Sequence, residues 1–135
     1  MGLFSIFQKS AEDIEAAGDR SFNGGDYGSA KVEYDRALER AEKNSPEKTA
    51  LIRRLTDKCR RSCEGLAGQH LENARELAAT GGHDAEALEL INLGLELTED
   101  AALKKSLVAL HHEIADEGAL FREISHEDAD SANTS

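Results

Sequence analysis

Apolar and small side chains recur every three or four residues through most of this chain, which is the spacing of amphipathic α-helices. The pattern predicts a first helix over about 11–22 and a second over about 27–43. The side chains expected to face inward are Ile14, Ala17, Gly18 and Phe22 in the first helix, and Ala30, Tyr34, Ala37, Leu38 and Ala41 in the second. Gly24 and Gly25 separate the two stretches, so we expect a helical hairpin closed by a tight turn.

A longer apolar stripe follows this hairpin. Its members are spaced four or three residues apart: Leu51, Leu55, Cys59, Cys63, Leu66, His70, Ala74 and Leu77. Because the stripe keeps its phase across Gly65 and Gly68, we expect one long helix over about 47–79. Each glycine costs an exposed helix about 1 kcal/mol relative to alanine, so a break between 64 and 69 that leaves two helices stays open as an alternative.

Two further helices are expected, over about 85–97 and 99–117. Their inner faces are predicted to consist of Ala87, Leu88, Ile91, Gly94 and Leu95, and of Leu103, Leu107, Leu110 and Ile114. Gly118 is expected to end the last helix, with Phe121 and Ile124 docking after it. The polar run from Ser125 onward is typical of a disordered tail.

Capping residues mark the expected helix starts. Ser10, with Asp13 three residues later, resembles a capping box. The expected N-caps of the later helices are Ser45, Asp84 and Thr98, and Pro46 is expected at the first position of the long helix. We therefore expect an apolar N-terminal segment over 1–10, a helical domain over 11–118 and a C-terminal segment over 119–135, mostly disordered from 125.

Composition and charge agree with a small all-α protein. Apolar residues make up 39% of the chain but aromatic residues only 4%, so a core of leucine and alanine suits helix packing better than a sheet. The net charge is −11, and residues 71–135 carry 15 acidic and 4 basic groups. Such a surface repels phosphate backbones, which disfavours nucleic acid as a partner. No stretch approaches the ~20 apolar residues of a membrane span, and we expect a cytoplasmic location.

The first hairpin resembles a tetratricopeptide repeat (TPR). The resemblance is carried by the following small, turn and aromatic positions: Gly18, Phe22, Gly25, Asp26, Tyr27, Ala30, Tyr34, Ala37 and Leu38. Gly18 opposite Ala30 is expected to permit close contact, and Tyr34 to fill the hairpin. A weaker match over 68–97 consists of Gly82, Ala87, Ile91, Gly94 and Leu95.

The second match is offset from the first. Ala30 and Ala87 lie 57 residues apart, whereas the usual repeat is about 34 residues long. The expected fold is therefore a short TPR-like array of antiparallel helical hairpins, with one long central helix and a C-terminal capping helix.

The resemblance implies a non-enzymatic adaptor that binds a protein or peptide segment along the first helix of each hairpin. This helix presents Glu12, Glu15 and Asp19 on that face, so a basic or apolar peptide is expected rather than an acidic one. The chain lacks a phosphate-binding loop and a nucleophile elbow. We therefore expect neither catalysis nor a cofactor.

The long helix carries the one basic patch, in which Arg54, Lys58 and Arg61 share a face. This patch could bind an acidic segment of a partner. It could also be a solvated face, or pair with the acidic C-terminal half of the chain.

Cysteine and histidine on the same helix suggest an alternative function. Cys59, Cys63 and His70 lie on one stripe, and thiolate and imidazole suit zinc. A metal- or redox-responsive protein is therefore one alternative, although three ligands on one helix cannot close a tetrahedron and core packing is expected. A self-assembling scaffold, in which the exposed end of the short array pairs with another copy, is a further alternative.

The N-terminal apolar segment contains Leu3, Phe4, Ile6 and Phe7. We expect it to dock onto its own domain. The alternative is a short anchor for a membrane surface or a partner, but four apolar residues without a cationic flank make a weak anchor.

Overall fold

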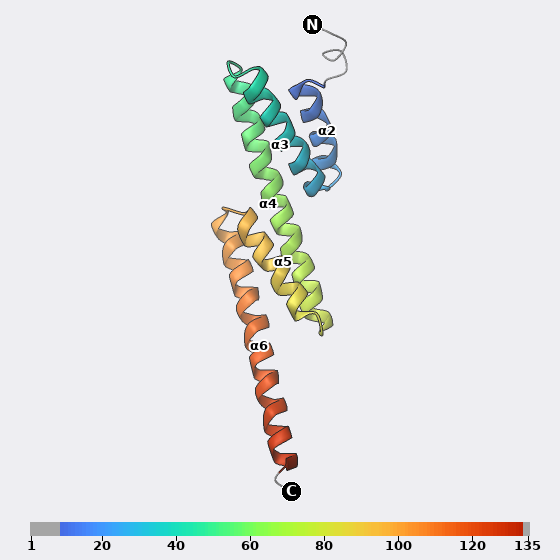
Figure 1. Cartoon of the computed structure of the whole chain (residues 1–135), viewed down its shortest axis with the longest axis vertical. Helices are drawn as coiled ribbons and strands as arrows, with labels where there is room; N and C mark the ends of the chain where they lie inside the picture. The colour runs from blue at the N-terminus through green and yellow to red at the C-terminus, as the bar shows by residue number, and fades with distance from the viewer. Residues whose placement is uncertain (1–8, 134–135) are drawn as a thin grey trace. The chain divides into compact units, whose positions relative to one another are not determined.

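A computed structural model describes the backbone of residues 9–133 and the side chains of residues 9–118. Its helices are α2 (Ala11–Asn23), α3 (Tyr27–Asn44), α4 (Thr49–Thr80), α5 (Asp84–Leu97) and α6 (Ala101–Asn133) (Figure 1). The described backbone contains no strand, so the predicted all-α fold is confirmed. The chain divides into two compact units, Met1–Leu66 and Ala67–Ser135, and α4 contributes to both.

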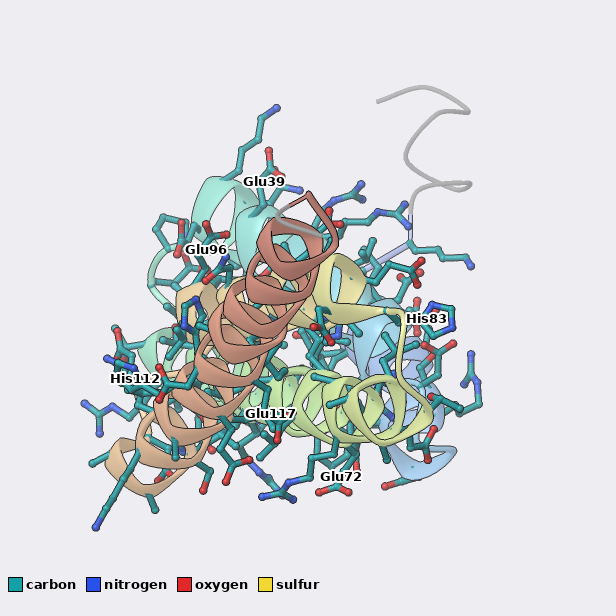
Figure 2. The ribbon with its side chains drawn as sticks, turned by 90° about the horizontal axis from the view of Figure 1, so that it is seen from below. Glu39, Glu72, His83, Glu96, His112 and Glu117 are labelled. Atoms are coloured by element: carbon teal, nitrogen blue, oxygen red, sulfur yellow. The ribbon has the colours of Figure 1, made fainter. Side chains whose placement is uncertain are left out.

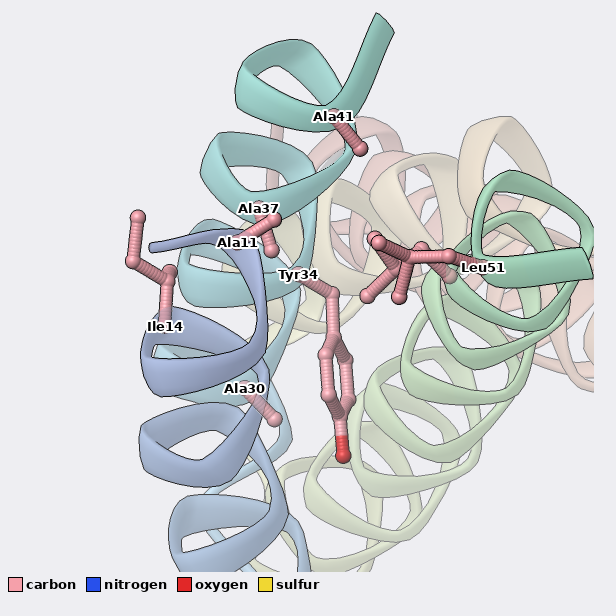
Figure 3. Packing of buried hydrophobic residues seen from close by; sticks show 8 residues of the cluster. Ala11, Ile14, Ala30, Tyr34, Ala37, Ala41 and Leu51 are labelled. Atoms are coloured by element: carbon pink, nitrogen blue, oxygen red, sulfur yellow. The ribbon is translucent and has the colours of Figure 1, made fainter. Parts of the chain in front are cut away.

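The core of the first unit is built around Tyr34. Helices α2 and α3 run in opposite directions (Figure 1), and their hairpin packs on Leu51 and Leu55 of α4. The Tyr34 ring is 2% exposed and lies among alanines of α3 and residues of α2 and α4 (Figure 3). A Cβ atom at Gly18 would lie 2.6 Å from Cε1 of Tyr34. The small residue predicted at Gly18 therefore makes room for the tyrosine ring.

The hairpin turn follows local backbone preferences. Ser10 and Asp13 form the predicted capping box at the start of α2. Gly25 has a φ of 80°, which glycine adopts at little cost. The Asp26 side chain accepts a hydrogen bond from the Ser29 amide at 3.0 Å and so caps α3.

The start of α4 differs from the prediction. Ser45 does not cap α4 but ends α3, where its amide donates to the Ala41 carbonyl. The Lys48 amide then bonds back to the Ser45 carbonyl at 2.9 Å, which closes a reverse turn through Pro46 and Glu47. The helix therefore begins at Thr49, because this turn uses the backbone groups that a cap at Ser45 would have needed.

Helix α4 is one continuous helix, which confirms the single long helix predicted from the stripe. Its most buried face is shifted in the middle, where Ser62, Ala67 and Leu71 are buried while Cys59, Cys63, Leu66 and His70 are only half-buried. Gly65 does not break the helix. A Cβ atom there would lie 2.8 Å from the Tyr27 ring, so the glycine lets that ring rest on the helix.

The second unit has its own core from α4, α5 and α6. Its buried members are Leu71, Ala74, Ala87, Ile91, Leu107 and Ile114. Gly94 is buried where a Cβ atom would lie 3.1 Å from Leu107 and 3.6 Å from the Ala67 carbonyl. As in the first unit, small residues set how closely these helices approach.

Two predicted caps in this unit are wrong. Gly81 and Gly82 both have a φ of 77°, and after them Asp84 is already the first residue of α5 rather than its cap. The position before α6 is taken by Asp100, whose carboxylate accepts from the Leu103 amide at 2.9 Å. Thr98 is buried at the end of α5, and its hydroxyl accepts from the Asp100 amide. The capping carboxylate therefore stands two residues later than predicted.

The end of α6 also differs from the prediction. The backbone is helical through Gly118 and through the run from Ser125 as far as Asn133, where a helix end and a disordered tail were expected. One glycine costs only about 1 kcal/mol, and no proline follows it to stop the helix. The predicted docking of Phe121 and Ile124 falls outside the described side chains, and the N-terminal apolar segment falls outside the described residues.

Candidate functional site

Helices α2 and α4 are joined by a buried carboxylate, that of Glu15, whose side chain is 8% exposed. Arg54 binds it with two parallel hydrogen bonds, from Nε to Oε2 at 2.6 Å and from Nη2 to Oε1 at 2.8 Å. Lys58 Nζ lies 2.9 Å from Oε2 of the same carboxylate. Paired donors of this geometry form one of the stronger kinds of hydrogen bond in proteins.

Asp19 extends this arrangement by one helical turn along α2. Lys58 Nζ lies 2.9 Å from its Oδ1 and 3.2 Å from its Oδ2. The Tyr34 hydroxyl donates to Oδ1 at 2.5 Å, and Lys58 Nζ lies 5.7 Å from the centroid of the Tyr34 ring. Glu15, Asp19, Tyr34, Arg54 and Lys58 thus form one network across three helices, called here the α2–α4 ion network.

The network fixes the charge of its members. The hydrogen bonds from Arg54 lower the pKa of Glu15 to about 2, against the opposing effect of burial, and Lys58 adds to this. Burial opposes the charge of Lys58, but its hydrogen bonds to Asp19 and Glu15 outweigh that effect and raise its pKa. Burial and the bond to Asp19 raise the pKa of Tyr34. The tyrosine is therefore neutral, and Glu15 and Lys58 are charged near neutral pH.

The ion network changes the interpretation of two candidate sites. The acidic face predicted to receive a partner is engaged within unit 1. Glu15 and Asp19 pair with α4, and Glu12 Oε1 lies 3.5 Å from Lys48, just before that helix. Arg54 and Lys58 pair with α2, whereas the acidic C-terminal half had been considered as their partner. A sequence signal existed, because both the acidic and the basic pair are spaced by four residues.

A pocket of about 250 Å³ opens beside the network. It is lined by Asp19, Phe22, Asn23, Tyr34, Lys58 and Arg61, and we call it the groove pocket. Arg61 Cζ lies 5.4 Å from the Phe22 ring centroid, and Phe22 meets Tyr27 edge-on at 5.1 Å between centroids. Among the described residues, Arg61 forms no ion pair, unlike Lys58 in the same wall. The pocket therefore combines aromatic faces with one unpaired guanidinium.

The cysteines lie in half-buried surroundings that raise their pKa values in the part of the chain that the structure describes. Both are free and half-buried. Burial raises the pKa of Cys59 to about 12, with a contribution from Asp35, and also raises the pKa of Cys63. Burial lowers the pKa of His70, and its Nδ1 has no hydrogen-bond partner among the described residues. No three histidine, cysteine or acidic side chains in the described part are placed to hold a metal ion.

The net charge is confined to the second unit. Residues 1–66 contain 12 basic and 12 acidic side chains, whereas residues 67–135 contain 4 and 15. Glu72, Glu96 and Glu117 are exposed members of this acidic surface (Figure 2). The residues that carried the weaker TPR match, Ala87, Ile91 and Gly94, are buried in the core of this unit and do not form a site.

The comparisons with known proteins leave the resemblance to a TPR as a prediction from the first hairpin. No helix in the described part of the chain is both long and apolar enough to cross a membrane. Protein-family models, curated proteins and solved structures were compared with this chain, and none matches it.

Proposed function

We propose that this chain is a non-catalytic protein-interaction module of TPR-like type that holds a peptide segment of a protein partner in the groove pocket. The observation that carries the proposal is the pocket itself, where α2, α3 and α4 together surround the half-buried Phe22 ring with several polar groups. Recognition sites usually combine apolar surface with placed polar groups, and in this pocket four of the six lining side chains are polar or charged.

The size of the pocket favours one side chain of a peptide. Pockets for whole small molecules usually measure about 300–1,000 Å³, whereas this one measures about 250 Å³. A peptide would therefore anchor one residue here and lay its backbone along the surface of α2 and α4. Asn23, which is exposed at the rim, can donate to and accept from a peptide backbone.

The sequence predicted a basic or an apolar peptide as the ligand, and the α2–α4 ion network favours the apolar one. A basic ligand would have to displace Lys58 from Asp19, which it contacts at 2.9 Å. An aromatic or aliphatic side chain can instead pack against the half-buried Phe22 without breaking that pair. Cytoplasmic location is part of the proposal, and two free, half-buried thiols fit a reducing compartment.

A peptide-array screen with a blocking variant tests the proposal. The array should contain apolar, basic and acidic pools, and the best binder is then titrated against the full chain. Asn23→Trp fills the rim of the groove pocket and is expected to weaken binding at least about tenfold. Asn92→Trp is the matched control, because Asn92 is also an exposed helical asparagine but lies in the second unit. The control should bind like the unaltered chain.

Two outcomes would overturn the proposal. One is the absence of saturable binding in all three pools. The other is binding that Asn23→Trp leaves unchanged while circular dichroism shows the helices intact.

A further inference from the structure

The two cations in the wall of the groove pocket differ in how their charge is used. Lys58 Nζ lies 2.9 Å from a carboxylate oxygen of Glu15 and 2.9 Å from one of Asp19. The Asp19 carboxylate also accepts a hydrogen bond from the Tyr34 hydroxyl. Arg61 lines the same pocket and forms no ion pair within the described residues. Since Lys58 and Asp19 offset each other, the pocket keeps the positive charge of Arg61.

An acidic residue one helical turn before Arg61 does not bind it directly. This residue is Asp57, and its partner is Arg60, whose Nη2 lies 2.7 Å from Oδ1. The hydrogen bond from Arg60 lowers the pKa of Asp57, and the charges of Arg60 and Arg61 add to this. The side chain of Asp57 is 51% exposed, so solvent screens its effect on Arg61. The Arg61 guanidinium therefore keeps its hydrogen-bonding capacity for a ligand.

The Phe22 ring places the Arg61 guanidinium beside the apolar surface of the pocket. Arg61 Cζ lies 5.4 Å from the centroid of this ring, and Tyr27 holds the ring edge-on from another direction. A guanidinium over a ring keeps its N–H groups in its own plane, where two of them can donate to one carboxylate. The contact also restricts the arginine side chain before binding, so less freedom is lost when a ligand arrives.

We propose that the groove pocket selects peptides in which an acidic residue stands within two residues of the apolar anchor, with Arg61 binding the acidic side chain. This inference rests on the proposed function of the pocket and adds a second feature of the partner. The anchor packs on Phe22, and the 5.4 Å from that ring to Arg61 corresponds to between one and two residues of extended peptide. Of the basic patch predicted from the sequence, only Arg61 is left for an acidic partner, because Arg54 and Lys58 pair within unit 1.

A peptide series on the full chain tests this proposal. In the apolar peptide that binds best, the two residues on each side of the anchor are replaced in turn by glutamate, glutamine or lysine. Every peptide carries an amidated C-terminus, so the chain end cannot supply the carboxylate. At one position we expect glutamate to bind about three- to tenfold more tightly than glutamine, as measured by fluorescence anisotropy. This preference should shrink between about 0.05 and 0.5 M salt, because the ion pair is exposed.

Variants of the chain then identify the residue that reads the charge. Arg61→Gln should bind the glutamate and glutamine peptides within about twofold of each other, because the cation is gone. Arg53→Gln is the matched control, since Arg53 is an exposed arginine of α4 outside the groove pocket, and it should keep the full preference. The readout is the ratio of the two affinities. A general weakening of the pocket lowers both affinities and leaves this ratio unchanged.

Three results would overturn this inference. They are equal affinity for glutamate and glutamine at every position, a preference that Arg61→Gln and Arg53→Gln change to the same extent, and a preference seen only when the C-terminus is free. The proposed function would survive each of them, provided that Asn23→Trp still weakens binding of the apolar peptide. Absence of saturable binding by any apolar peptide would instead overturn the proposed function and this inference together.

Discussion

Removing the charge of Glu15 is the most direct test of how unit 1 is held together. Glu15→Gln keeps the size of the side chain but leaves Arg54 and Lys58 without the carboxylate that they share. We expect the variant to fold, because the core around Tyr34 is untouched. We also expect a measurable fall in the free energy of unfolding of this unit.

The magnitude follows from the pKa of Glu15. Its fall from 4.5 to about 2 corresponds to an upper limit of about 3 kcal/mol at neutral pH. The side chain of Arg54 is 50% exposed, so solvent screens part of this interaction. The glutamine also keeps some hydrogen bonding. We therefore expect a loss of about 1–2 kcal/mol.

The lowered pKa of Glu15 also predicts how the free energy of unfolding changes with pH. A carboxylate whose pKa is lowered by folding stabilises the folded state fully above its unfolded pKa, here 4.5, and this stabilisation is lost as the pH falls toward 2. The unaltered chain should thus lose stability between about pH 5 and 2 more steeply than Glu15→Gln. Urea unfolding followed by tyrosine fluorescence reports on unit 1 specifically, because Tyr27 and Tyr34 are the only tyrosines and the chain has no tryptophan.

Two results would refute this reasoning. The first is a difference below about 0.3 kcal/mol at pH 7, since exposed ion pairs contribute that little. The second is an equal difference at pH 7 and pH 3, which would show that lost packing rather than lost charge causes the effect. Glu12→Gln is the control, because Glu12 is 48% exposed at 3.5 Å from Lys48 and should change stability by less than about 0.5 kcal/mol.

Three further predictions concern glycine and cysteine positions. Gly18→Ala should lower the unfolding free energy by about 1–3 kcal/mol in urea titrations, because its Cβ would overlap the Tyr34 ring; an unchanged value would show that the hairpin is less tightly packed. Gly68→Ala should raise the free energy of unfolding by up to about 1 kcal/mol in thermal unfolding, since a Cβ atom there meets no other atom and alanine favours the helix. A lower free energy of unfolding would contradict this prediction. Cys59 and Cys63 should react with a thiol reagent at least about tenfold more slowly in the native protein than in urea, because burial raises their pKa; fast native labelling would argue for a redox role.

Helix positions could be predicted well from the sequence because their signals are local. The stripe from Leu51 to Leu77 predicted one continuous α4, and the Gly24–Gly25 turn predicted the α2–α3 hairpin. Caps were less predictable. Ser45, Asp84 and Thr98 all have side chains that can cap a helix, but the turn before each helix decides which residue reaches the first free amides.

The candidate site was harder to predict than the fold. Periodicity placed Glu15 and Asp19 on one face of α2, and Arg54 and Lys58 on one face of α4. It predicted a partner for the acidic face, and for the basic face a partner, solvent or the acidic C-terminal half, but it did not predict that these two faces pair with each other. The contact between them joins residues 39 apart in the chain. Such a contact depends on how the α2–α3 hairpin packs on α4 through the apolar core around Tyr34 and Leu55, and neither charged face by itself shows that packing.

The sequence by itself therefore determined the helices, their turns and the small residues that let them approach, since each of these depends on a few neighbouring residues. Only the tertiary structure decided which charges are paired and which are free. In the structure, Arg54 and Lys58 of α4 pair with the acidic face of α2. Arg61 forms no ion pair with the described residues and lines the groove pocket. Arg40 donates a hydrogen bond to the Lys9 carbonyl just before α2. The reason is physical, because pairing depends on distances of a few ångströms between segments that the order of residues alone does not bring together.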